Sequence, residues 1–246
     1  MRLAEEVYIV GGGRNGLGIS DDYDCNVYLI NGGEEMALID TGVGIDTDKI
    51  INNISCDGVD PVKIRYILLT HGHADHSGGG KQLRDRLGAE VAISKDEAEF
   101  IRRGDEVNLG LDVARADDVY PFSYHLQPCE VDIELEDDQR ISIGRLEVEA
   151  IATPGHSKGS ICYLLKGKDK TYLFSGDTVF CGGTISLLNC VGSSLEDYRL
   201  NISKLAGLGV DGLLPGHISF CLGGGQDHID MVIEAFKGLW PPKNAF

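Results

Sequence analysis

Four side chains that bind divalent metals occur within six residues of this chain. They are His71, His73, Asp75 and His76, and they follow the apolar stretch at residues 66–70, which predicts a strand. Imidazole and carboxylate groups bind borderline divalent cations, and a cluster at a strand end can direct several of them to one point. Three of the chain's seven histidines fall in this run, which favours a metal site over a polar loop that happens to be rich in histidine.

Three further candidates occur later, each directly after an apolar strand pattern and beside a glycine. They are His156 and His217, which both follow Pro-Gly, and Asp177, which follows Ser-Gly. Taken alone, a histidine after Pro-Gly is more often a turn residue than a ligand. Together with the run at residues 71–76, these residues make five histidines and two aspartates, the number that two metal ions with one shared carboxylate require.

The segments that must position these side chains alternate between strand and helix patterns. Strand patterns cover residues 7–10, 25–30, 36–39, 64–70, 140–143, 146–151, 160–165, 171–174 and 212–214, and the first three are expected to be antiparallel. Helical patterns cover residues 46–54, 81–87, 95–103, 193–206 and 227–236, and residues 104–128 are the least regular stretch. No linker interrupts the order, which predicts one domain over residues 1–246, with two similar halves around one core.

Composition limits the classes of partner. Hydrophobic residues make up 42% of the chain and charged residues 25%, as in ordinary soluble globular proteins. The formal charge of −17 would repel nucleic acid, and no apolar run approaches the about 20 residues that span a bilayer. The chain shows no signal peptide, and its seven cysteines have no C-x-x-C spacing. We therefore expect a cytoplasmic protein with reduced thiols, a small-molecule substrate, and no nucleic-acid or membrane partner; the oligomeric state stays open.

The ordered set of candidates resembles the metallo-β-lactamase superfamily. The resemblance implies an α/β fold, a four-layer αββα sandwich of the metallo-β-lactamase type with the metal site at one edge. Residues 38–42, Leu-Ile-Asp-Thr-Gly, also match the family and imply that Asp40 lies near the site and supports a ligand without binding metal. Carried over by position, the resemblance implies that the first ion is held by His71, His73 and His156. The ligands implied for the second ion are Asp75, His76 and His217, and Asp177 is implied to bridge the two ions.

Within the superfamily, residues 176–183 are most similar to the glyoxalase II group, the hydroxyacylglutathione hydrolases. Their sequence is Gly-Asp-Thr-Val-Phe-Cys-Gly-Gly. That group hydrolyses glutathione thioesters and carries a helical glutathione-binding domain after its last metal histidine. Only 29 residues follow His217 here, so the helical domain is absent from this sequence and the identity of the thiol half stays open.

The resemblance implies a dinuclear metal-dependent hydrolase. Two ions about 3.5 to 4 Å apart lower the pKa of a bridging water, and the resulting hydroxide attacks a carbonyl carbon. The substrate class that follows is a small thioester, ester or lactone, with Asp75 and Asp177 as the catalytic carboxylates. Histidine and aspartate ligands accept zinc, iron and manganese, and we expect zinc first, with iron or manganese as alternatives.

Other functions on the same scaffold are considered. Lactonases of the acyl-homoserine-lactone type and β-lactamase-like amide hydrolases use the same chemistry. Persulfide dioxygenases use a single iron, and the complete second ligand set in this chain argues against that function. Flavodiiron oxygen reductases are disfavoured because they have a glutamate where this chain has His73. Nuclease branches are disfavoured by the −17 charge. A non-catalytic metal-binding or sensing protein is an alternative of another class, disfavoured by the intact ligand set.

Several residues outside the ligand set are weighed separately. His228, in the closing helical pattern, is expected at the surface, and Cys181 is expected to be a buried, inert thiol. The irregular stretch at residues 104–128 contains Tyr120, Tyr124 and His125. Whether these side chains or the tail after His217 contact the substrate is left open by the sequence.

Overall fold

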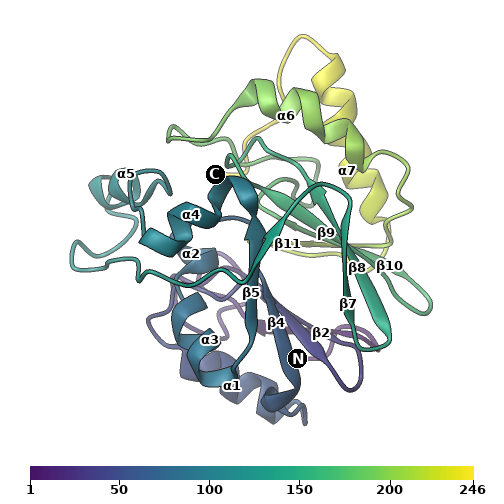
Figure 1. Cartoon of the computed structure of the whole chain (residues 1–246). Coiled ribbons are helices and arrows are strands. Elements are labelled where there is room, and N and C mark those ends of the chain that lie inside the picture. The colour runs from purple at the N-terminus through teal and green to yellow at the C-terminus, as the bar shows by residue number, and fades with distance from the viewer.

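The computed structural model of the chain describes residues 1–246 and contains two β-sheets, which pack face to face (Figure 1). The first sheet has the strand order β1-β2-β3-β4-β5-β6. Its strands are β1 (Val7–Gly11), β2 (Val27–Asn31), β3 (Met36–Ile39), β4 (Ile64–Leu68), β5 (Glu90–Ser94) and β6 (Ile133–Leu135). The second sheet has the order β11-β10-β9-β8-β7, formed by β7 (Gln139–Ile143), β8 (Leu146–Ala152), β9 (Ile161–Lys166), β10 (Thr171–Gly176) and β11 (Gly212–Pro215).

Helices cover the outer face of each sheet (Figure 1). Against the first sheet lie α1 (Thr47–Cys56), α3 (Gly80–Leu87) and α4 (Lys95–Arg103), and the loops of the same half carry the short helices α2 (Ala74–Ser77) and α5 (Leu111–Ala116) and the 3-10 turn η1 (Pro61–Lys63). On the second lie α6 (Leu195–Asn201), the 3-10 turn η2 (Ile202–Leu205) and α7 (Gly225–Lys237). None of these helices combines the length and apolar character that crossing a membrane would need.

The expected αββα sandwich is confirmed, but the apolar interior is not one core. A central layer lies between the sheets, where the rings of Tyr28 and Phe174 pack edge to face at 5.5 Å. A second apolar layer, around Leu29, lies between the first sheet and its helices. A third, around Leu173, lies between the second sheet and its helices. Three layers arise because the central strands are apolar on both faces, as in sheets that are covered on both sides.

Strand direction brings the candidate residues to one edge of the sandwich. Strands β3, β4, β5 and β6 run parallel, and so do β10 and β11. Strand β8 pairs antiparallel with β9, which pairs antiparallel with β10, so β8 and β10 point the same way. The carboxyl ends of β3, β4, β8, β10 and β11 therefore supply the loops that carry the candidates.

The structure differs from the sequence expectation in several places. Strands β5 and β6 and the short helix α2 are additional, and α5 lies within the stretch expected to be irregular. The helix expected at residues 193–206 divides into α6 and η2. The two halves also differ: the first sheet has six strands and the second has five. The first three strands are antiparallel as expected.

Candidate metal centre

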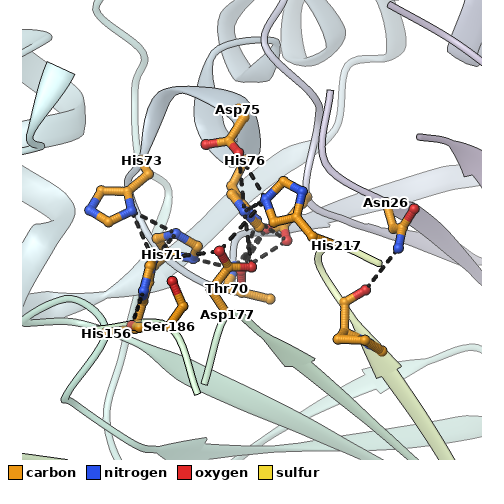
Figure 2. A network of polar contacts seen from close by, with 12 residues as sticks. Asn26, Thr70, His71, His73, Asp75, His76, His156, Asp177, Ser186 and His217 are labelled. Atoms are coloured by element: carbon orange, nitrogen blue, oxygen red, sulfur yellow. Dashed lines mark hydrogen bonds and ion pairs between the residues drawn. The ribbon is translucent and has the colours of Figure 1, made fainter. Parts of the chain in front are cut away.

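Three imidazole rings from both sheets meet at a first cluster (Figure 2). Nε2 of His71 lies 3.1 Å from Nδ1 of His73, and Nε2 of His156 lies 3.1 and 2.9 Å from these two atoms. His71 and His73 follow β4, whereas His156 follows β8 in the second sheet. The first cluster is therefore assembled only when the two sheets pack together.

The outward nitrogen of His156 shows which ring atom faces the cluster. Nδ1 of His156 lies 2.7 Å from the carbonyl oxygen of Ser186. A carbonyl can only accept, so Nδ1 carries the proton and Nε2 of the neutral ring presents a lone pair to His71 and His73. Burial, with neighbouring imidazoles, lowers the pKa of His73 to about 3 and that of His71 well below its ordinary value. These imidazoles are therefore neutral, and the lone pair on Nε2 of His156 points toward the other two rings.

A second cluster consists of Asp75, His76 and His217. Oδ2 of Asp75 lies 2.9 Å from Nε2 of His217, and the Nε2 atoms of His76 and His217 are 3.3 Å apart. Burial opposes the charge on each group, but attraction between the imidazoles and the nearby carboxylates, including Asp177, prevails. It lowers the pKa of Asp75 and raises those of His76 and His217. A bound cation would take the place of the imidazole protons that the carboxylate attracts.

Asp177 lies between the two clusters (Figure 2). Its Oδ2 atom is 3.7 Å from Nε2 of His156 in the first cluster and 3.6 Å from Nε2 of His217 in the second. Its Oδ1 atom is buried, accepts no hydrogen bond and lies 3.4 Å from Nε2 of His76. Burial opposes its ionisation, but these imidazoles lower the pKa of Asp177.

The donor set fits a metal site. Inward lone pairs that no hydrogen donor satisfies are costly in a protein interior unless a cation binds there. Here three neutral imidazoles converge, and a buried carboxylate oxygen without a hydrogen bond lies beside them. Nitrogen and carboxylate donors in this number are the ligands that zinc and similar divalent ions use. The sequence-predicted candidates are thus all brought together in two adjoining clusters.

Asp40 supports the second cluster from behind, in the position expected for it. Its Oδ2 atom lies 2.8 Å from Nδ1 of His76, which turns Nε2 of that ring toward Asp75 and Asp177. Its Oδ1 atom accepts the backbone N–H of Thr70 at 2.7 Å. A fully buried carboxylate thus links the end of β3 to the loop after β4.

Glu97, which the sequence reasoning did not single out, joins the loops of the first cluster. Its Oε2 atom accepts the N–H of Gly72 at 2.7 Å, between His71 and His73. Its Oε1 atom accepts the N–H of Gly159 at 3.0 Å, just after His156. Burial raises the pKa of Glu97, and these donors partly offset that cost. One buried carboxylate in the first turn of α4 therefore sets the spacing of the two loops.

Glu97→Gln should weaken metal binding at the first cluster by about 10- to 100-fold. The amide keeps only one acceptor oxygen, so its NH₂ group would face the N–H of Gly72 or Gly159. Titration against a chromogenic chelator measures the affinity. Glu99→Gln changes an exposed carboxylate on the same helix and serves as the control. Equal affinity in the wild type and Glu97→Gln would remove Glu97 from this role.

A pocket of about 420 Å³ opens over both clusters. Its floor includes His73, Asp75, His156, Asp177 and His217. Leucine and valine side chains from residues 109–119 form an apolar wall, and the pocket is also lined by Tyr120 and, from the tail, Phe246. A carbonyl compound with an apolar portion would therefore reach the clusters in a partly water-excluded space.

The remaining weighed residues lie away from the floor. His125 is exposed and pairs with Glu106 at 3.0 Å, and Tyr124 donates its hydroxyl to the carbonyl of Val43. His228 is not a free surface residue, since it is half-buried and its Nδ1 accepts the N–H of Gly182 at 3.1 Å. Cys181 is only half-buried, because it lies in the loop after β10 and not in a core strand.

Comparison with known proteins extends the geometric result. The chain is 33% identical over 213 residues to the acyl-coenzyme A thioesterase MBLAC2 of Bos taurus, covering 79% of this chain and 73% of that protein. It is 31% identical over 160 residues to a hydroxyacylglutathione hydrolase of Anaeromyxobacter dehalogenans (strain 2CP-C), covering 65% and 48%. The similarity to the glyoxalase II group thus covers less of the chain than the similarity to this thioesterase.

The fold and the family agree. A solved metallo-β-lactamase structure from Cronobacter sakazakii (Enterobacter sakazakii) superposes with a TM-score of 0.70 at 26% identity, covering 88% of this chain and 80% of the other. Residues 20–217 match the family model described as the metallo-beta-lactamase superfamily. With an αββα sandwich and buried histidine and aspartate clusters at its edge, the chain belongs to the metallo-β-lactamase superfamily.

Proposed function

We propose that the protein is a zinc-dependent hydrolase of small acyl thioesters. The observation that carries the proposal is the position of Asp177, which adjoins both donor clusters at the floor of a pocket with an apolar wall. In this proposal His71, His73 and His156 hold one ion, Asp75, His76 and His217 hold the other, and Asp177 contacts both. The thioesterase named above, which shares 33% identity with this chain, supports the choice of substrate class.

Bound zinc ions would polarise the substrate carbonyl and activate a water molecule near neutral pH. The protein's own residues supply position and shape. Asp75 lines the pocket, and its Oδ2 atom lies 2.9 Å from Nε2 of His217, so the carboxylate lies where it can orient a water beside the carbonyl carbon. The apolar wall excludes bulk water from the acyl portion and strengthens the electrostatic contacts at the floor.

Tyr120 offers a hydrogen-bond donor in the same pocket. Burial, together with the charge of nearby Asp75, raises the pKa of Tyr120 well above its ordinary value, so the hydroxyl stays protonated. The side chain lines the pocket and can donate to an oxygen or sulfur of the substrate as negative charge develops there. In the proposed reaction Tyr120 therefore assists at the leaving thiolate or at the carbonyl oxygen.

Removal of metal should abolish hydrolysis of acyl thioesters, and zinc should restore it. The purified protein is expected to contain close to two equivalents of zinc by elemental analysis. A parallel screen of acyl thioesters, acyl-homoserine lactones and a chromogenic β-lactam tests the substrate class. Full thioesterase activity in a folded, metal-free protein would contradict the proposal. Turnover restricted to lactones or β-lactams would reassign the substrate, and no turnover on any class would favour a non-catalytic protein.

A further inference from the structure

One cationic side chain reaches the proposed active-site pocket of this acidic protein. Arg14, in the loop between β1 and β2, is the only lysine or arginine among the residues that line it. The chain has a formal charge of −17, so an arginine here stands against the general sign of the surface. Fixed cations beside a reaction site attract and orient anionic groups of a substrate.

The Arg14 guanidinium is held in place by an aromatic ring and not by a carboxylate. It lies 5.3 Å from the centroid of the Tyr23 ring, and that ring packs against Tyr120 at 5.7 Å. Arg115, on α5, instead forms an ion pair with Glu106 at 2.5 Å. Because an aromatic face leaves the N–H fork of arginine available, Arg14 can still bind an anion through two parallel hydrogen bonds.

The loop that carries Arg14 is fixed to the second cluster. The N–H of Ile218 donates to the carbonyl oxygen of Asn15 at 2.5 Å, directly after His217. The N–H of Arg14 donates to the carbonyl oxygen of Asp22 at 3.0 Å, which closes the base of the loop. Arg14 therefore belongs to the side of the pocket next to His217.

Another part of the pocket lining is apolar and lies beside the first cluster. It is formed by Leu109, Leu111 and Val113. A methyl group placed on Gly110, between these residues, would lie 3.7 Å from Nε2 of His73. The pocket is therefore apolar near the first cluster, and its one guanidinium belongs to the loop that contacts the second cluster.

We propose that Arg14 binds an anion carried by the thiol half of the thioester, while the acyl half lies against the apolar wall. The inference rests on the proposed thioesterase function and adds the chemical class of the leaving group. A carboxylate or a phosphate satisfies the N–H fork equally well. Arg14 and the clusters line one pocket of about 420 Å³, so the anion must belong to a thiol half that reaches from the clusters to Arg14.

Asp117 provides a charge of the opposite sign on the same pocket. It caps the carboxyl end of α5, is exposed and lines the opening. An anion bound at Arg14 would be repelled by this carboxylate, so the two residues should have opposite effects on an anionic substrate. A neutral substrate should respond to neither.

The experiment uses two pairs of substrates that differ only in the anion. One pair is an acyl 4′-phosphopantetheine and the same acyl pantetheine; the other is an N-acetylated S-acyl glutathione and its diethyl ester. The zinc-loaded wild type should show a KM about three- to tenfold lower for an anionic member than for its neutral partner. The pair with the larger ratio identifies phosphate or carboxylate as the anion.

Three variants locate the effect. Arg14→Gln should raise KM for the anionic substrate about three- to tenfold, with kcat within about twofold and the neutral substrate unaffected. Asp117→Asn should lower KM for the anionic substrate only. Arg145→Gln, an exposed arginine away from the pocket, is the matched control and should change nothing. Equal KM values within both pairs, or a preference that survives in Arg14→Gln, would overturn the proposal.

A binding measurement separates this inference from the proposed function. Thioether analogues of both pairs lack the cleavable carbonyl, and calorimetry gives their Kd values without turnover. Tighter binding of an anionic thioether that is lost in Arg14→Gln supports the anion site even if no thioester is hydrolysed. Active hydrolysis with equal Kd values in the wild type and Arg14→Gln rejects the anion site and leaves the thioesterase assignment standing.

Discussion

Replacing Asp177 with alanine is expected to lower both the metal content and the turnover of the protein, with turnover falling by more than about a hundredfold. The physical reason is the shared position of this side chain. Its Oδ2 atom lies 3.7 Å from His156 and 3.6 Å from His217, so one deletion removes a donor from both clusters. Removing the carboxylate also leaves the facing imidazoles without their compensating charge.

Elemental analysis and thioester kinetics on the same preparation test this prediction. Circular dichroism and thermal unfolding must show that the Asp177→Ala protein is folded. Asp169→Ala changes an exposed aspartate in the β9–β10 hairpin and should leave metal content and turnover unchanged. Two equivalents of metal in folded Asp177→Ala would exclude Asp177 from the metal site.

Asp40→Asn is expected to have the largest effect on stability, about 3 to 5 kcal/mol, together with 10- to 100-fold weaker metal binding at the second cluster. Asp40 is fully buried and contacts Nδ1 of His76 at 2.8 Å. The amide can still accept from the N–H of Thr70, but its NH₂ group would then face Nδ1 of His76. The ring would lose the acceptor that fixes which nitrogen faces Asp177.

The choice of asparagine isolates the charge from the backbone. Asp40 has a φ of +62°, a left-handed conformation that asparagine tolerates better than alanine. Urea unfolding gives the stability, and chelator titration gives the affinity of each metal equivalent. Asp60→Asn, at an exposed turn, is the control. Wild-type stability and affinity in Asp40→Asn would show that Asp40 does not set the orientation of His76.

The sequence predicted the parts of the site that depend on local pattern. An apolar strand followed by a turn places a side chain at a sheet edge, and this holds for His71, His156, Asp177 and His217. The number and types of these candidates indicated two ions, and their division into two ligand sets came from the resemblance to the family. Asp40, which directly follows β3, was predicted instead from the resemblance of residues 38–42 to the family.

The sequence did not predict residues whose roles depend on distant contacts. In the sequence, Glu97 looks like an ordinary acidic residue in the first turn of a helix. It nevertheless accepts hydrogen bonds from the N–H groups of Gly72 and of Gly159, which is 62 residues from Glu97 in the chain. Arg14 lies in a glycine-rich loop that joins two strands, and its place at the pocket depends on the contact between Asn15 and Ile218. Strand β5 is a short run between two helical patterns, so its pairing with β4 has no local signal.

The two clusters also connect separate parts of the sandwich. Four candidates, His71 to His76, follow β4 in the first sheet, and His156, Asp177 and His217 follow strands of the second. Any ion that binds both groups is a further cross-link between sheets that otherwise meet through apolar packing and a few buried hydrogen bonds, such as that of the Tyr28 hydroxyl to the carbonyl oxygen of Pro215. Its binding free energy therefore adds to the cohesion of the two halves, so metal supply would govern resistance to heat and proteolysis as well as turnover.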